Sequence, residues 1–300
     1  MPIRREAAVD GRRVDYAELF GHLSVPLAWG PPDWLANPRT GAVADSDLAW
    51  WRIGDFDDAV GDIKLFWELS RFDFTIPFMK RAVGGDAESL DRLNLWLRDW
   101  CDRNPPYLGL NWKCGQECSI RVLQLCAAML VSGRPATRSL LWLLKTNVER
   151  IKPTVSYAIS QNNNHGTSEA SALFVGGLAL DDSAVASLGR KLLENRVAVL
   201  IAEDGTFSQY STNYHRLMLD TIAFAELFRR TTTEPRFSEN LYDRVSRSVR
   251  WLNDLTDNRS GEAPNLGAND GARVLAYRPS DHNDMRPTLQ LAGLLFSSPL

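Results

Sequence analysis

Nearly every periodic segment of this 300-residue chain has apolar residues at helical spacing, and this periodicity is the feature that most restricts its fold. The alternation of apolar and polar residues that marks a half-buried strand is almost absent. Helices are predicted over residues 57–70, 74–84, 87–102, 112–132, 136–150, 165–180, 183–202, 213–230, 238–255 and 284–296. The fold class is therefore predicted to be all-α.

The segments between these helices are short and rich in Gly, Pro and Asn, as in residues 104–109 and 131–135. Short connections between helices of similar length place sequence neighbours antiparallel to each other. Such helical hairpins form either a solenoid or a closed ring, and no strict sequence repeat distinguishes the two.

The composition is that of a globular protein with a substantial core. Hydrophobic residues make up 44% of the chain and charged residues 24%, and the formal net charge is −3. This charge gives no sign of a nucleic-acid partner. No apolar run is long enough to span a membrane, so no membrane partner is predicted. The N-terminal residues lack the apolar region of a secretory signal, which predicts a cytoplasmic protein, or a periplasmic one whose leader has been removed.

The four cysteines, Cys101, Cys114, Cys118 and Cys126, crowd one stretch and raise the question of a metal site. No histidine lies within this stretch to complete a familiar zinc site. Cys118 and Cys126 fall among apolar residues, which favours thiols packed in the core. We therefore predict no metal and no cofactor.

One string of polar residues, Asn163-Asn164-His165, directly precedes a predicted helix. Asparagine side chains compete for backbone hydrogen bonds inside a helix but cap helix starts well. Asn164 and His165 are therefore expected at a helix N-terminus, where free backbone N–H groups and the helix dipole favour an anion. The alternative is an ordinary asparagine-rich loop.

A second polar string, Tyr214-His215-Arg216, opens the helix predicted from residue 213, after an Asp-Gly turn at 204–205. Amide, imidazole, phenol and guanidinium groups at two helix starts indicate a pocket for a carboxylate with proton-transfer groups beside it. The structural alternative is a Tyr-His pair whose rings are simply half-buried on the helix.

Acidic and basic residues lie at helical spacing in two segments. Arg121 follows Glu117 by four residues, and we predict an intrahelical ion pair between them. Arg71 follows Glu68 by three residues and stays open as a substrate-binding residue.

Most of the ten tryptophans are expected to fill the core. Trp112 is the predicted exception, because it follows a loop that contains Gly109 and Asn111. A flat ring in a cleft suits the apolar face of a sugar, so Asn111 and Trp112 are predicted to bind substrate.

Short blocks of residues occur in a fixed order along the chain. They are Asp62-Ile63-Lys64 with Trp67-Glu68-Leu69 and Arg71, then Asn104-Pro105 with Gly109, Asn111-Trp112, Glu117 and Arg121, then Asn164-His165, Asp204-Gly205 and Tyr214-His215, and finally Pro264-Asn265-Leu266-Gly267 with Asn269-Asp270. Taken together, these blocks resemble the helical domain of heparinase II/III-like polysaccharide lyases, from about residue 45 to the end of the chain.

This resemblance implies an incomplete (α/α) toroid of antiparallel helical hairpins over residues 45–300, preceded by an N-terminal extension over residues 1–44. Lyases of this family also carry a C-terminal β-sandwich domain that supplies a second histidine to the site. Neither is expected in this sequence, so the β domain is predicted as a missing partner.

The resemblance also implies the chemistry, which is β-elimination at the uronic acid of an acidic polysaccharide. Carried over by residue, Asn164 and His165 would neutralise the carboxylate, and Tyr214 would act as base, acid or both. A phenol with an ordinary pKa of ~10 needs a neighbour that favours phenolate, and His215 and Arg216 are adjacent in sequence. The predicted substrate-binding residues are Arg71, Asn111, Trp112, Asn163, His215 and Arg216.

The chain departs from the family pattern just before the Tyr-His pair. An acidic or arginine residue is often found there, whereas this sequence reads Gln209-Tyr210-Ser211-Thr212-Asn213. The departure concerns the substrate subsites rather than the elimination itself.

Two other functions stay open. A glycoside hydrolase on a similar helical toroid would use paired carboxylates, for which Glu169, Glu203 and Asp204 are the nearest supply. A non-catalytic polysaccharide-binding module, acting in bacterial capsule or exopolysaccharide biosynthesis, would keep the pocket without turnover.

Overall fold

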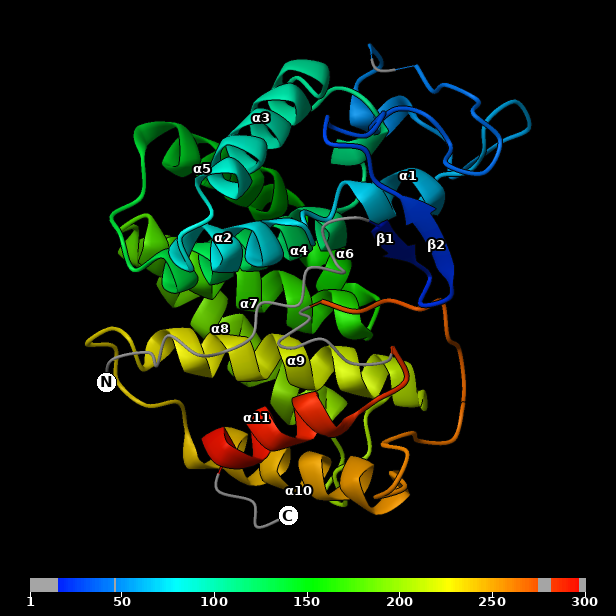
Figure 1. Cartoon of the computed structure of the whole chain (residues 1–300). Coiled ribbons are helices and arrows are strands. Elements are labelled where there is room, and N and C mark those ends of the chain that lie inside the picture. The colour runs from blue at the N-terminus through cyan, green and yellow to red at the C-terminus, as the bar shows by residue number, and fades with distance from the viewer. Residues whose placement is uncertain (1–15, 46, 275–281, 297–300) are drawn as a thin grey trace.

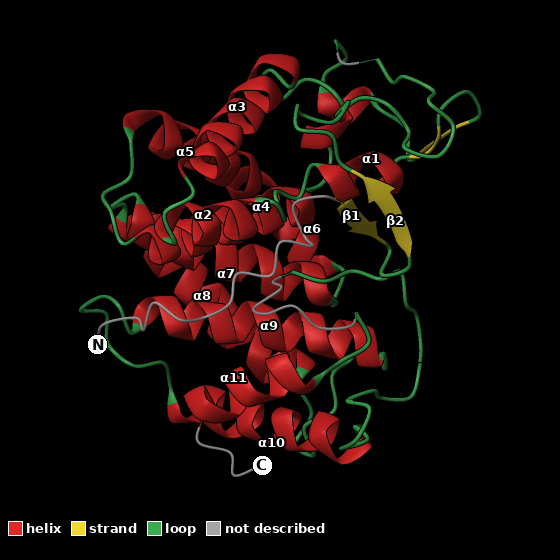
Figure 2. Ribbon diagram, viewed as in Figure 1, coloured by secondary structure: helices red, strands yellow, loops and turns green. Residues whose placement is uncertain are grey.

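The computed structural model describes residues 16–45, 47–274 and 282–296, and it shows stacked helices with two small β-hairpins (Figures 1 and 2). The helices are α1 (Lys64–Leu69), α2 (Thr75–Val83), α3 (Ala87–Arg103), α4 (Gly115–Ser132), α5 (Arg138–Ile151), α6 (Val155–Ser160), α7 (Asn164–Ala179), α8 (Ser183–Leu200), α9 (Thr212–Arg229), α10 (Glu239–Leu255) and α11 (Arg286–Phe296). The strands are β1 (Tyr16–Leu19), β2 (Leu23–Pro26), β3 (Phe56–Asp57) and β4 (Gly61–Asp62), and short 3-10 helices include η2 (Trp50–Arg52), η3 (Leu110–Trp112) and η4 (Lys152–Thr154). Strands β1 and β2 pair antiparallel, as do β3 and β4.

Helix α7 lies at the centre of the stack, packed against α4, α8 and α9 (Figure 1). It is buried along most of its length, and its buried residues include the polar Thr167, Ser168 and Ser171 as well as apolar ones. A Cβ on Gly177 would lie 2.4 Å from the backbone nitrogen of Ala186, and one on Gly189 would lie 2.2 Å from that of Phe174. These two glycines therefore allow α7 and α8 to approach closely.

Local capping explains why the predicted helix starts agree with the structure. Side chains that accept a hydrogen bond from a backbone N–H of the first turn cap α3, α5, α7, α8, α9 and α10, and they are Asp86, Thr137, Asn163, Asp182, Ser211 and Ser238. Capping depends on residues close in sequence, so it can be predicted without the tertiary structure.

The first predicted helix, 57–70, is wrong over its first half. Only Lys64–Leu69 is helical there, and the residues before it form the β3–β4 hairpin. Gly61 has a φ of 85°, a backbone conformation that a helix does not contain. Helix α6 was not predicted either, because six residues are too few to show a helical period.

The β1–β2 hairpin is attached to the helices through the core. Leu19 and Trp34 are buried in the same hydrophobic cluster as the helices, so the described part of the extension shares their core. The boundary at residue 44 stays a prediction.

Residues 1–15, on which the prediction about a leader rests, lie outside the described residues. Among the helices that the structure describes, none is long and apolar enough to cross a membrane.

Candidate active site

The two polar strings lie at the starts of α7 and α9, as predicted. Asn163 caps α7 by accepting a hydrogen bond from the backbone N–H of His165 at 3.0 Å. Ser211 caps α9 by accepting one from the backbone N–H of Tyr214 at 3.1 Å. His165 and Tyr214 therefore occupy first helical turns, where the helix dipole favours negative charge.

Gln209 joins the two helix starts. Its side-chain Oε1 accepts a hydrogen bond from the backbone N–H of Asn164 at 2.8 Å, and Ser208 donates from Oγ to the carbonyl of Asn162 at 3.3 Å. The two strings are therefore neighbours in space. The uncharged residue at the position of departure from the family pattern contributes to this link.

Tyr214 lies beside Asp270 and Lys64. The half-buried phenol of Tyr214 donates a hydrogen bond to the carboxylate of Asp270. Lys64 Nζ lies 3.4 Å from Asp270 Oδ2, and the Lys64 side chain is 44% exposed. Burial, the charge of Asp270 and its hydrogen bond raise the pKa of Tyr214, and Arg71 only partly opposes them. Although burial acts to raise the pKa of Asp270, the Tyr214 hydrogen bond and the charges of Arg71 and Lys64 bring it below its ordinary value.

His165 is half-buried and shares charged neighbours with this group. Burial lowers the pKa of His165, with the charges of Glu117 and Asp270 opposing the shift and that of Lys64 adding to it. The ring is therefore neutral at pH 7 and offers one N–H donor and one acceptor.

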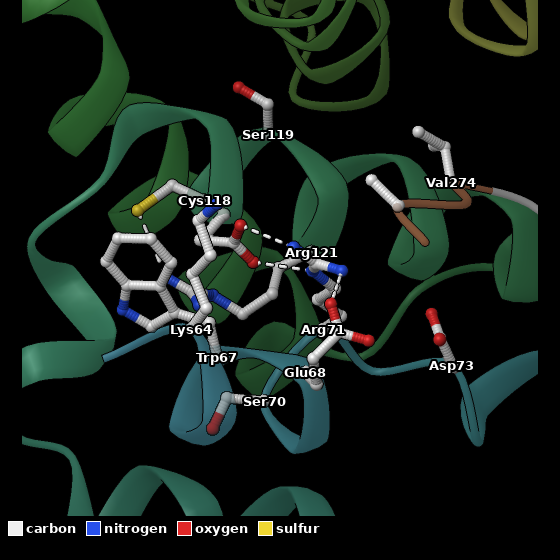
Figure 3. A network of polar contacts seen from close by, with 12 residues as sticks. Lys64, Trp67, Glu68, Ser70, Arg71, Asp73, Cys118, Ser119, Arg121 and Val274 are labelled. Carbon is white, nitrogen blue, oxygen red and sulfur yellow. Dashed lines mark hydrogen bonds and ion pairs between the residues drawn. The ribbon is translucent and has the colours of Figure 1, made fainter. Parts of the chain in front are cut away.

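Arg71 has a buried side chain that contacts two carboxylates (Figure 3). Its Nε and Nη2 donate to the two oxygens of Glu117 at 2.8 and 2.9 Å, and its Nη1 donates to Glu68. Burial raises the pKa of Glu68 to about 7 against the opposing charge of Arg71. All three donor nitrogens of Arg71 are thus engaged, and the structure places this side chain in a buried ion network.

The predicted intrahelical pair of Glu117 and Arg121 is wrong, because Glu117 pairs with Arg71 instead. Arg121 donates from Nε to Asn147 Oδ1 at 2.9 Å and from Nη2 to the backbone carbonyl of Asn111 at 2.7 Å. A helical spacing permits an ion pair between Glu117 and Arg121, but Glu117 instead pairs with Arg71, which lies in the turn after α1.

Asn111 and Trp112 lie inside the protein, with exposed fractions of 0% and 1%. The Asn111 amide donates to Asn104 Oδ1 at 2.9 Å, and Trp112 Nε1 donates to the carbonyl of Asn104 at 3.1 Å. The indole of Trp112 packs 5.4 Å from the Arg121 guanidinium. The structure thus places both residues in the packing beneath the loop and not on an open surface.

His215 and Arg216 point away from Tyr214, although they follow it directly. The His215 ring contacts Ser248 Oγ at 2.7 Å and stacks on Trp251, and burial lowers its pKa to about 4. Arg216 is also buried and donates from Nη2 to Asn213 Oδ1 at 2.7 Å. Successive helix residues point about 100° apart, which explains why only Tyr214 faces Asp270.

The three carboxylates considered for a hydrolase lie in different environments. A Cβ on Gly115 would lie 2.4 Å from Glu169 Oε1, so Glu169 is pressed against the start of α4. Its Oε2 has no hydrogen-bond partner among the described residues, and burial raises its pKa to about 8 against the charge of Arg150. Glu203 and Asp204, by contrast, are exposed in the turn between α8 and α9.

The cysteines are free thiols, and Cys118 and Cys126 are buried in the core, as predicted. Burial raises the pKa of Cys101 to about 11 and that of Cys114 to about 12, so both stay protonated at neutral pH. Within the described residues, no group of three or more His, Cys, Asp or Glu side chains is placed to hold a metal ion.

Lys64, Asp270, Glu117 and Gln209 surround the predicted residues but were not predicted as site residues. Lys64, Glu117 and Asp270 fall within the ordered blocks of the resemblance, which is the signal that could have identified them. Their contacts join distant parts of the chain, and no local pattern predicts such contacts.

Comparisons with known proteins show that the fold of this chain is known from other structures. No protein-family model matches the chain, and no curated protein matches it. A crystal structure of heparinase III has a TM-score of 0.55 and 16% identity, covering 76% of this chain and 36% of that chain. A heparinase III structure with methylated lysines gives 0.54 and 16%, covering 86% and 42%. The crystal structure of heparan sulfate lyase HepC from Pedobacter heparinus gives 0.52 and 18%, covering 88% and 40%.

This similarity confirms the predicted resemblance at the level of the fold. The chain has the helical, incomplete toroid found in the heparinase III structures, at low sequence identity. It spans between 36% and 42% of the length of those proteins.

Proposed function

We propose that this chain is a polysaccharide lyase domain that cleaves a uronic-acid-containing polysaccharide by β-elimination. The observation that carries the proposal is that His165 and Tyr214 lie in the first turns of α7 and α9, two helix starts that Gln209 links. Both side chains have Asp270 as a charged neighbour, and Lys64 lies beside Asp270. An amide, a neutral imidazole, a phenol and an ammonium group around two helix N-termini suit an anionic sugar. The heparinase-like fold supports the same class of substrate.

The chemistry requires the substrate carboxylate to lose its effective charge first. The C5 proton of a uronate is weakly acidic until hydrogen bonds and positive charge stabilise the carbanion that forms next to the carboxylate. Asn164 and His165 would hold the carboxylate, helped by Lys64 and by the start of α7. Tyr214 would then remove the C5 proton, and the C4 oxygen would leave with a proton.

The proposed roles of the other predicted residues follow from their positions. Asn163 acts by capping α7 and fixing His165. Arg71 acts through Glu117 and not by direct contact, since its nitrogens are engaged. The buried side chains of Asn111, Trp112, His215 and Arg216 would support the elements that carry the site.

The test is a panel of acidic polysaccharides incubated with the chain, followed by the near-ultraviolet absorbance of the unsaturated uronate product. Tyr214→Phe is expected to lower the rate by about 10²–10⁴-fold, the usual contribution of a general acid or base. Asn164→Ala is expected to abolish product as well. Tyr157→Phe is the matched control, because Tyr157 is 71% exposed on α6 and lies outside the stretch at residues 209–213, and it should keep full activity.

Each alternative gives a different result in this assay. New reducing ends without absorbance would identify a hydrolase and reject the lyase. Binding without product, unchanged in Tyr214→Phe, would identify a polysaccharide-binding module. That second candidate is favoured by one observation, the raised pKa of Tyr214 beside Asp270, which disfavours the phenolate that would act as a base.

A further inference from the structure

The hydroxyl of Tyr214 has a defined proton acceptor, the carboxylate of Asp270. Three contacts from different parts of the chain meet at this carboxylate. Its Oδ1 accepts a hydrogen bond from the backbone N–H of Ala272 at 3.1 Å, Lys64 lies 3.4 Å from Oδ2, and Tyr214 donates its phenolic proton. The orientation of Asp270 toward Tyr214 is therefore fixed by several groups.

The backbone next to Asp270 is also fixed. Gly271 has a φ of 72°, and a Cβ there would lie 2.0 Å from the backbone carbonyl of Phe20 in the β1–β2 turn. Phe20 donates its N–H to Glu68 Oε2 at 3.0 Å, and Glu68 pairs with Arg71. The loop that carries Asp270 is thus pressed against a turn that is itself tied to the buried ion network.

The charges that face this pair disfavour a phenolate. Asp270 and Glu117 act on Tyr214 with negative charge, and Arg71, the opposing cation, is already matched by two carboxylates. Lys64 lies 3.4 Å from Asp270, and His165 is a neutral ring on which the charges of Asp270 and Glu117 act. A neutral phenol can accept the C5 proton only if its own proton leaves in the same step.

Resting on the proposed function, we propose that Asp270 accepts the phenolic proton of Tyr214 as Tyr214 removes the C5 proton. The C5–H bond breaks and its electron pair forms the C4–C5 double bond, while the proton binds the phenolic oxygen and the original phenolic proton moves to the Asp270 carboxylate. The C4–O bond breaks with its electron pair on oxygen, which takes the proton from Tyr214 as Asp270 returns its proton to the phenol. The net result is one proton moved from C5 to the leaving oxygen.

The first measurement needs no substrate and follows ionisation of Tyr214 by the absorbance of its phenolate. The Tyr214→Phe variant supplies the baseline for the other tyrosines. In the otherwise unaltered chain, Tyr214 should ionise at higher pH than an exposed tyrosine. In Asp270→Asn it should ionise at lower pH than in the unaltered chain, and in Asp270→Glu it should stay high. A Tyr214 titration that is unchanged by Asp270→Asn would overturn the pairing.

The second measurement is the pH profile of kcat and KM on the polymer found by the panel. Asp270→Asn should lower kcat by about 100-fold or more with little change in KM, and Asp270→Glu should restore part of kcat. Asp254→Asn, on the exposed face of α10, is the matched control and should leave both unchanged. If Asp270→Asn does not fold, the solvent isotope effect on the unaltered chain decides the matter, because the phenolic proton exchanges with solvent and the carbon-bound C5 proton does not. A rate of C5–H cleavage that is slower in D2O supports the transfer, and a rate that is the same in H2O and D2O would overturn it.

The outcomes separate this proposal from the proposed function. No unsaturated product from any uronate polymer would overturn the lyase function and the proton transfer together. Product formation that survives Asp270→Asn at a similar kcat, with the Tyr214 titration shifted, would overturn the transfer alone.

Discussion

Two charged groups beside α1 have similar components and different surroundings. The closed network consists of Glu68, Arg71 and Glu117, and its side chains are between 3% and 7% exposed. The open network consists of Lys64, Tyr214 and Asp270, in which the Lys64 side chain is 44% exposed and that of Asp270 is 26% exposed.

The two networks differ in what their groups can still bind. Every donor nitrogen of Arg71 contacts a carboxylate, so the closed network holds the end of α1 against α4. In the open network, the Lys64 side chain is 44% exposed and thus accessible to an anion, and Tyr214 donates a hydrogen bond to Asp270. Burial and full pairing therefore mark the closed network as structural, whereas the open network keeps an exposed cation, as the proposed function requires.

Breaking the closed network should give the largest effect on stability. Glu117→Gln leaves Arg71 buried with one carboxylate in place of two, and we expect the free energy of unfolding to fall by about 3–5 kcal/mol. Denaturant titration measures this change. Glu149→Gln removes an exposed pair with Lys145 and should change the free energy by less than ~1 kcal/mol. An equal loss of unfolding free energy in Glu117→Gln and Glu149→Gln would contradict the distinction between the buried network and an exposed ion pair.

A buried carboxyl outside both networks should make stability depend on pH. The pKa of Glu169 is about 8 in the folded chain against an ordinary value of 4.5, so the folded chain keeps a proton that the unfolded chain releases between these values. The free energy of unfolding should therefore fall as the pH rises from about 4.5 to about 8, by about 2–4 kcal/mol. Glu169→Gln should flatten this decline, as measured by denaturant titration at several pH values. The exposed control Glu203→Gln should keep the decline. If the free energy of unfolding falls with pH as steeply in Glu169→Gln as in Glu203→Gln, groups other than Glu169 cause the decline.

Weakening the open network should affect substrate binding more than stability. Lys64→Gln removes an accessible positive charge, and we expect KM for the acidic polymer to rise about 10-fold, equivalent to about 1.4 kcal/mol of binding. Steady-state kinetics measures this change, with Lys145→Gln on the exposed face of α5 as the control. A fall in kcat at constant KM would instead place Lys64 with the proton transfer.

Local chemistry explains what could be predicted from the sequence. The starts of α7 and α9 were predicted because Asn163 and Ser211 cap them within three residues of the helix start. Tyr214 and His165 were consequently placed in first turns, and the long helical periods gave the fold class.

Long-range packing explains what could not be predicted. The partner of Glu117 is Arg71 and not the nearby Arg121, and Lys64 meets Asp270 from the other end of the chain. Sequence adjacency to Tyr214 suggested a site role for His215, but the direction of each side chain on α9 depends on the helices packed around it. These contacts form only when the helices of the toroid are packed together, so no local sequence pattern predicts them.

The contact between Gly271 and the turn at Phe20 has a consequence for folding. These residues lie near opposite ends of the described chain, so closing the loop between them costs more entropy than forming any helical hairpin. We expect the helices to assemble first and the contact to form late, as is usual for contacts of high sequence separation. During synthesis, Asp270 leaves the ribosome only after α1, α7 and α9, so the nascent chain acquires Lys64, His165 and Tyr214 before it acquires the carboxylate that contacts Lys64 and Tyr214.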